Sequence, residues 1–208
     1  MRHGYFSSIG EIAPFFRISL WGKEIKRTER VELLDETIDM EVIEMADVIT
    51  RCWNAYLSLD KIGAGGWVTK KGCTFFEKQF KVGTDEYKYV LLAHEGQHWA
   101  DLKNYSGLKQ TDMEYRAKLV ELYYLWDELE RFFRFIDTMI DTDDRTYPHA
   151  YAERKLIQGL SRKIFDTELE TDKSKWAEKA DELPEAMLEL FKEHNAMMAQ
   201  RKGDEHVI

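Results

Sequence analysis

The sequence lacks the features that mark membrane-spanning and exported proteins. It contains no run of about 18 apolar residues, and its first residues hold no uninterrupted apolar stretch of the signal-peptide kind. We therefore expect neither a membrane-spanning helix nor a cleaved signal. The expectation is a soluble, cytoplasmic protein without a membrane partner.

Cysteine is also scarce. The chain has two cysteines, Cys52 and Cys73, and their spacing matches neither a metal-binding motif nor a redox motif. We expect both to be thiols of the core, and a single disulfide between them is the alternative.

Basic residues are in the minority, with 30 Lys and Arg against 39 Asp and Glu and a formal net charge of −9. Such a chain lacks the positive potential that attracts polyanions, so we expect no nucleic-acid partner. A peptide or protein substrate is compatible with this charge. With 208 residues and 44% hydrophobic content, the chain can bury one core, and we expect a single domain over 1–208.

Only six histidines occur, yet two of them stand four residues apart in the segment His94-Glu-Gly-Gln-His98. This segment matches the H-E-x-x-H pattern. On a helix, residues at this spacing are about 400° apart in rotation and roughly 6 Å apart along the axis, so both imidazoles leave one face. That geometry suits one tetrahedral Zn²⁺ ion. Glu95 lies about 100° round the helix, where we expect it to act as general base on the attacking water.

A third ligand must come from another segment. A short loop at 106–110 is expected to fold the next helix back antiparallel, which would let Glu114 in its first turns face the two imidazoles. Glu121 lies two turns further on the same face and is the competing candidate. A different residue is also possible, because Thr111-x-x-Glu114 matches a capping box, in which Glu114 would bind the backbone N–H of Thr111.

Other polar residues near the motif have less distinctive patterns. Asp101 lies seven residues after His94 on the same helix face, so it could orient a ring N–H of a zinc histidine or be a solvated charge. His149 begins a later helix, and we expect it to have no role, with stabilisation of an oxyanion as the alternative. Tyr105 has the same two interpretations. We expect His3, His194 and His206 to be solvated.

These residues resemble a gluzincin, a zincin that takes two histidines from H-E-x-x-H and a glutamate from a downstream helix. The short gap and the Glu114-x-x-Ala117 pattern are most similar to the ImmA/IrrE-type metallopeptidases, over residues 85–125 only. In that family the glutamate of E-x-x-A is the third zinc ligand, which the resemblance assigns to Glu114. The chain departs from the family at Gly96-Gln97 and at Lys118. The metzincin extension is absent, since Asn104 stands six residues after His98.

The rest of the pattern indicates an α+β fold that is predominantly helical. We expect a short strand at 15–22, a long amphipathic helix at 28–59, and a β-hairpin formed by 67–69 and 73–80. A helix at 112–138, an acidic loop at 137–148 and helices at 149–168 and 184–200 should follow. Residues 201–208 are expected to be a disordered tail. The hairpin would pack on the zinc-site helix pair, as in a zincin.

The function expected from the sequence is a zinc-dependent metallopeptidase, with Zn²⁺ held by His94, His98 and Glu114 and with Glu95 as the general base. The first alternative is a non-catalytic metal-binding or helical interaction domain. A ferritin-like di-iron protein is a weaker alternative, because Glu95-x-x-His98 is the only ExxH unit in the chain and that architecture needs two.

Overall fold

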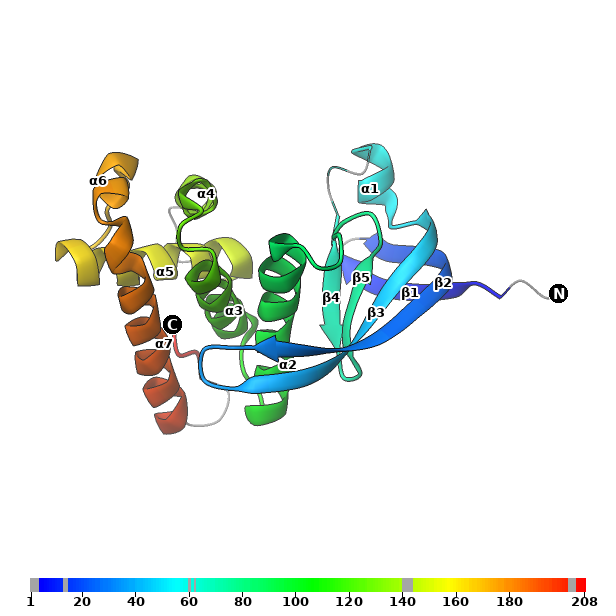
Figure 1. The fold of residues 1–208 in the computed structure, drawn as a ribbon, viewed down its shortest axis with the longest axis horizontal. Coiled ribbons are helices and arrows are strands. Elements are labelled where there is room, and N and C mark those ends of the chain that lie inside the picture. Colours follow the sequence, from blue (N-terminus) through cyan, green and yellow to red (C-terminus); the bar gives the residue numbers. More distant parts are fainter. Residues whose placement is uncertain (1–3, 13–14, 60, 62, 140–143, 202–204) are drawn as a thin grey trace. The chain divides into compact units, whose positions relative to one another are not determined.

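The computed structural model describes residues 4–12, 15–59, 61, 63–139, 144–201 and 205–208. It shows an α+β protein, as the sequence predicts, with strands in the first part of the chain and helices in the second (Figure 1). The chain divides into two compact units, one formed by 1–31 and 37–96 and the other by 32–36 and 97–208. The finer expectations, a zincin-like arrangement and a single domain, stay predictions.

Unit 1 contains a curled sheet of five strands in the order β1-β2-β3-β5-β4 (Figure 1). Strand β1 (Phe6–Ile12) is antiparallel to β2 (Phe15–Glu32), with Ile9 opposite Ile18. Strand β3 (Thr37–Thr50) is parallel to β5 (Gly72–Phe76), and β4 (Gly66–Thr69) is antiparallel to β5. The predicted strand at 15–22 is therefore the first part of a much longer strand.

The prediction of a long helix at 28–59 is wrong. Most of that segment is strand, and only α1 (Trp53–Leu57) is helical. At the start of β3, Ile38, Met40 and Val42 are buried while the acidic residues between them are exposed, which is the period of two of a strand. Apolar residues are frequent enough here to match a helical spacing as well. Pairing with the neighbouring strands decides between the two patterns.

The predicted β-hairpin is confirmed by β4 and β5, although β5 ends at Phe76 and not at residue 80. Gly66 is required there because a Cβ at this position would lie 2.7 Å from the carbonyl oxygen of Thr74 and 2.8 Å from Leu91. Both cysteines are buried free thiols, as expected, and no disulfide joins them. The core beneath the sheet includes Trp21, Met45 and Phe76.

The helix that carries the H-E-x-x-H motif is confirmed, but its first part is unusual. Residues Glu86–Ala93 form a π-helix, η1, and α2 (His94–Asn104) continues from it directly. The boundary between the two units falls inside α2, between Gly96 and Gln97. After α2 the chain turns at Gly107, whose φ of 69° lies in the left-handed region that glycine adopts most readily.

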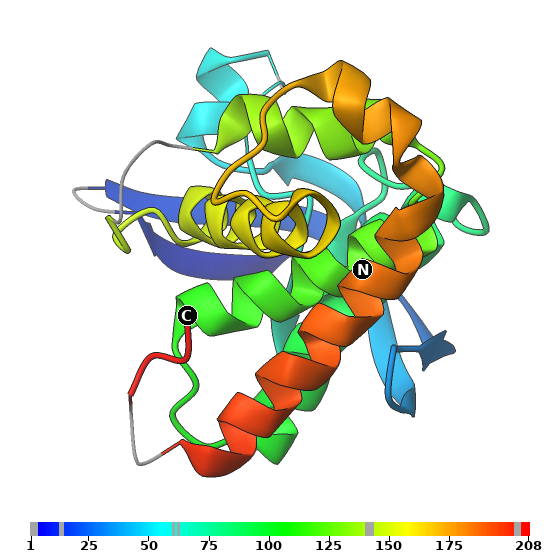
Figure 2. The same cartoon turned by 90° about the vertical axis from the view of Figure 1, so that its left-hand side faces the viewer.

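Unit 2 is helical. Besides residues 32–36 and the part of α2 from Gln97 onward, it contains α3 (Gln110–Tyr124), α4 (Leu129–Thr138), α5 (Pro148–Phe165), α6 (Lys173–Glu178), the 3₁₀ turn η2 (Ala180–Glu182) and α7 (Leu183–Gln200). Helix α5 packs against α3, α4 and α7 (Figure 2). The helices predicted at 149–168 and 184–200 are confirmed by α5 and α7.

The single helix predicted at 112–138 is broken into α3 and α4 between Tyr124 and Leu129. No glycine or proline marks this break in the sequence. It lets the ring of Phe132 pack edge-on against Trp176, 4.9 Å between ring centroids, and Trp176 is completely buried. Tertiary packing of aromatic side chains therefore accounts for a break that the local pattern does not show.

Part of the predicted tail, residues 205–208, is described by the structure. Residues 202–204 lie outside the described residues, but the backbone N–H groups of Val207 and Ile208 donate to Oδ1 of Asp112 at 3.1 and 3.0 Å. His206 lies 3.1 Å from the hydroxyl of Thr111. These contacts hold the last residues against the first turn of α3.

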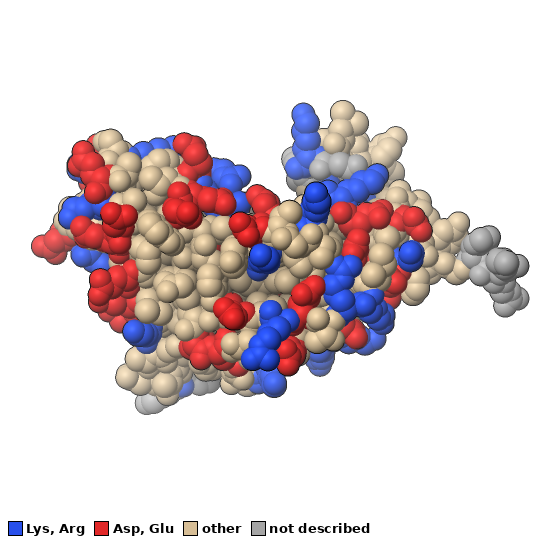
Figure 3. Space-filling view, in the orientation of Figure 1, with Lys and Arg blue, Asp and Glu red and all other residues tan. Residues whose placement is uncertain are grey.

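Acidic side chains account for much of the visible surface of the helical unit (Figure 3). They gather where α6, η2 and the start of α7 lie, and the exposed acidic residues of these elements include Glu178, Asp181, Glu182 and Glu185. The absence of a nucleic-acid partner stays a prediction.

Candidate metal centre

Helix α2 carries both histidines of the motif, one helical turn apart. His98 is buried, with 6% of its surface exposed, whereas His94 and Glu95 are half-buried. Since a single helix carries all three residues, its geometry sets the spacing of the two imidazoles.

Helix α3 brings Glu114 to this pair. The Oε1 atom of Glu114 lies 3.7 Å from Nε2 of His98, and both side chains are more than nine-tenths buried. One ligand atom from each of His94, His98 and Glu114 can be chosen so that all three lie within 4.8 Å of one another. Among the residues that the structure describes, this is the only group of three or more His, Cys, Asp and Glu side chains close enough to hold one metal ion.

Glu114 and Glu121, the two candidates for the third ligand, have different neighbours in the structure. Glu121 is buried further along α3, where its Oε1 atom lies 3.5 Å from Nη1 of Arg131. The capping box is not formed: α3 begins after Lys109, and the hydroxyl of Thr111 instead contacts the ring of His206. Glu114 is thus the glutamate of α3 that the fold places beside both histidines.

His149 reaches the same place from another helix. Its Nδ1 atom lies 2.9 Å from Oε2 of Glu114, although 63% of the histidine side chain is exposed. Pro148 and His149 begin α5, where proline is favoured because its missing N–H would have no intrahelical partner. The sequence pattern favoured no role for His149, and it did not predict this contact with Glu114. Glu114 and His149 are 35 residues apart in the sequence and α4 lies between them, so no local sequence pattern indicates that they meet.

Asp101 takes part in a buried polar network. Its Oδ1 atom accepts hydrogen bonds from Nε2 of Gln97 at 2.8 Å and from Nε of Arg116 at 2.9 Å. Burial raises the pKa of Asp101 to about 6, although the charge of Arg116 acts in the opposite direction. Arg116 also donates to Oδ1 of Asn195 at 2.6 Å, so the network joins α2, α3 and α7. It ties the helix of His98 to the helix of Glu114.

His194 was expected at the surface, and this prediction is wrong. The side chain is completely buried, with Nδ1 at 3.4 Å from Nη1 of Arg116 and Nε2 at 3.8 Å from Oδ1 of Asp112. Burial lowers the pKa of His194. Arg116 and His194 were not recognised from the sequence because the network that holds them joins segments about 80 residues apart. Tyr105 contributes its ring to the same network, 5.5 Å from the guanidinium of Arg116.

Glu95 acts electrostatically on a residue of the hairpin of unit 1. The pKa of the Cys73 thiol on β5 is raised well above its ordinary value, mainly by burial and further by the negative charge of Glu95. Strand β5 therefore passes within electrostatic range of the expected general base.

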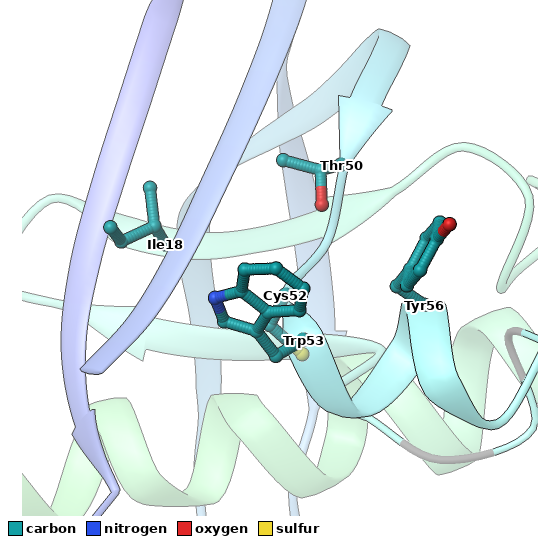
Figure 4. Close-up of a pocket in the computed structure, with 5 residues that line it drawn as sticks. All are labelled: Ile18, Thr50, Cys52, Trp53 and Tyr56. Carbon is teal, nitrogen blue, oxygen red and sulfur yellow. The ribbon is translucent and has the colours of Figure 1, made fainter. Parts of the chain in front are cut away.

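A pocket of about 360 Å³ opens elsewhere on unit 1 (Figure 4). Among the described residues, Trp53 and Tyr56 of α1 line it together with Ile18, Thr50 and Cys52. None of these residues belongs to the His94, His98 and Glu114 group. Its described lining residues are mostly apolar, and none of them carries a carboxylate or an imidazole.

No family model, no curated protein and no solved structure matches this chain. None of the helices in the described part of the chain is long and apolar enough to cross a membrane. The function must therefore be argued from the chemistry of the site.

Proposed function

We propose that the protein is a zinc-dependent metallopeptidase whose metal ligands are His94, His98 and Glu114 and whose general base is Glu95. The observation that carries the proposal is the convergence of the three ligand residues, whose donor atoms lie within 4.8 Å of one another. Two of them flank Glu95 on one helix. The resemblance of residues 85–125 to gluzincins of the ImmA/IrrE type supports the choice of peptide bonds as substrate.

The donor set fits a catalytic zinc ion. Two imidazole nitrogens and one carboxylate oxygen form one of the three-ligand sets of such sites, which leave a fourth position open. Donors around a tetrahedral zinc ion lie roughly 3–3.5 Å apart, since each is about 2.0–2.2 Å from the metal. The 3.7 Å between His98 Nε2 and Glu114 Oε1 is close to that separation. The donor atoms as a group lie within 4.8 Å of one another, so binding of zinc would have to draw them closer together.

When bound, zinc would supply a Lewis acid that polarises the scissile carbonyl group and promotes ionisation of water. The chain's own part in the reaction is proton transfer by Glu95. Its carboxylate accepts a proton from the water whose oxygen attacks the carbonyl carbon. It then delivers this proton to the leaving nitrogen as the C–N bond breaks. The products are a carboxylic acid and an amine, which ionise to a carboxylate and an ammonium group when the second proton of the water passes to the amine, and Glu95 returns to its ionised form.

The test compares the wild-type protein with Glu95→Gln, each loaded with zinc and incubated with a peptide mixture derived from a proteome digest. Mass spectrometry of new peptide termini measures cleavage. Glu95→Gln should still bind zinc, because Glu95 is not a ligand, while cleavage falls by at least about 10²-fold. Cleavage that survives this substitution, or a wild-type protein that cleaves nothing when fully loaded, would rule out the proposed mechanism.

A further inference from the structure

The two carboxylate oxygens of Glu114 face different histidines. Oε1 lies 3.7 Å from Nε2 of His98, whereas Oε2 lies 2.9 Å from Nδ1 of His149. The second distance is within reach of a hydrogen bond, although the ring N–H does not point at Oε2 in this structure and a turn of the exposed ring would be needed to direct it there. One oxygen is thus directed to the metal group and the other to a residue outside that group.

We propose that His149 is a positioning residue, which holds Oε2 of Glu114 through its Nδ1–H so that Oε1 stays directed at the metal position. This inference rests on the proposed function, because it assumes that Glu114 is a zinc ligand. A ligating carboxylate that is itself hydrogen-bonded pays less entropy on binding the metal, and partners of this kind typically change metal affinity by 10–100-fold.

The packing of α5 against α3 supports this role. Glu114 and Lys118 stand four residues apart on α3, and His149 and Glu153 stand four residues apart on α5, so each pair lies along one helix face. The Nζ atom of Lys118 donates to Oε1 of Glu153 at 2.8 Å, and both side chains are about nine-tenths buried. The contact between His149 and Glu114 is therefore the outer of two successive polar contacts between the same two helices.

The buried contact fixes the register of α5 on α3. Oε2 of Glu153 also accepts a hydrogen bond from the hydroxyl of Thr138 at 3.0 Å, which adds the end of α4 to the same arrangement. With this part of α5 held in place, the first turn of the helix presents His149 to Glu114. The exposed His149 ring is thus placed by its helix and needs no packing of its own.

The exposure of His149 makes the test clean, because replacing a side chain that is 63% exposed removes little packing. His149→Leu deletes the donor. His149→Asn retains it, since the amide nitrogen of asparagine occupies nearly the same position as Nδ1 of histidine. Tyr147→Leu is the matched control, because Tyr147 is also an exposed residue and lies just before α5.

The first readout is zinc affinity, measured by competition with a chromogenic chelator, together with the visible absorption of the cobalt-substituted protein. We expect His149→Leu to bind zinc about 10–100-fold more weakly and to alter the cobalt spectrum. His149→Asn and Tyr147→Leu should stay within about threefold of the wild type, with unchanged spectra. A wild-type affinity in His149→Leu would overturn the inference and leave the proposed function standing. A wild-type protein that binds no zinc would overturn both.

The second readout needs no substitution, and it applies even if a variant fails to fold. The ¹⁵N chemical shifts of the His149 ring in the zinc-loaded wild type report which nitrogen carries the proton at pH 8. The inference requires the proton on Nδ1, where it can be donated to Glu114. A neutral ring with its proton on Nε2 would contradict the inference whatever the zinc affinity.

Discussion

Arg116 on α3 donates from Nε to both carboxylate oxygens of Asp101 on α2, at 2.9 and 3.0 Å. Only 1% of either residue is exposed. The guanidinium also lies 4.5 Å from the ring centroid of Phe191 on α7. Asp101 is three residues after His98 and Arg116 is two residues after Glu114, so this ion pair fixes two proposed ligands relative to each other.

Removing the arginine should therefore destabilise the helical unit. Arg116→Met keeps much of the apolar volume but leaves the Asp101 carboxylate buried without its cation, and we expect a loss of about 3–5 kcal/mol in the free energy of unfolding. Urea denaturation measures it. Arg162→Met is the control, because the Arg162–Glu168 pair is largely exposed and solvent screening should leave it little effect on stability. Equal effects of the two substitutions would show that the buried pair has no special role.

The same carboxylate predicts a pH dependence. Because burial raises the pKa of Asp101 from 3.8 to about 6, the folded state binds this proton more readily than the unfolded state between those values. Protonation of Asp101 therefore adds stability as pH falls from about 7 to about 4, and this stability is lost as pH rises through 6. Asp101→Asn cannot titrate. Relative to that variant, the wild type should gain about 2 kcal/mol over this range.

The comparison with Asp101→Asn is needed because another buried group acts with the opposite sign. His194 has a lowered pKa in the folded state, so the unfolded state binds its proton more readily and acid reduces stability below the ordinary pKa of 6.5. The contribution of His194 is present in both proteins, whereas that of Asp101 is present only in the wild type, so the difference between the two proteins isolates Asp101. A stability difference between the two proteins that does not change with pH would contradict the raised pKa.

The choice between the two glutamates of α3 gives a separate prediction. Glu114→Ala should weaken zinc binding by orders of magnitude, because it removes one of three protein ligands. Glu121→Ala should keep the zinc and lose stability, since it removes an anion that lies 3.5 Å from the buried Arg131. Parallel chelator titrations of the two variants measure the difference. If Glu121→Ala releases the zinc and Glu114→Ala does not, the third ligand is Glu121 and the assignment to Glu114 is wrong.

Much of the candidate site could be predicted because its signals are local. His94, Glu95 and His98 lie within one turn of one helix, and Glu114 follows after a single short loop. The residues that support this group come from distant segments. His149 and His194 reach α3 only through the packing of α5 and α7, which no local pattern encodes.

The fold shows the same limit. Some elements carry a clear signal in the sequence. Glycines mark the hairpin of β4 and β5, and a proline marks the start of each of the helices α5 and α7. Strand β3 was predicted as a helix because its dense apolar residues satisfy both periods, and only pairing with β5 distinguishes them. The π-helical turn before His94 also has no sequence signal.

The most direct test of the central claim is the zinc content of the purified protein, measured by elemental analysis beside the His94→Ala/His98→Ala double variant. The geometry predicts about one zinc ion per chain in the wild type and almost none in the double variant, since two of its three protein ligands are gone. Full zinc occupancy in the double variant, or a wild-type protein that takes up no zinc when the metal is supplied, would contradict it.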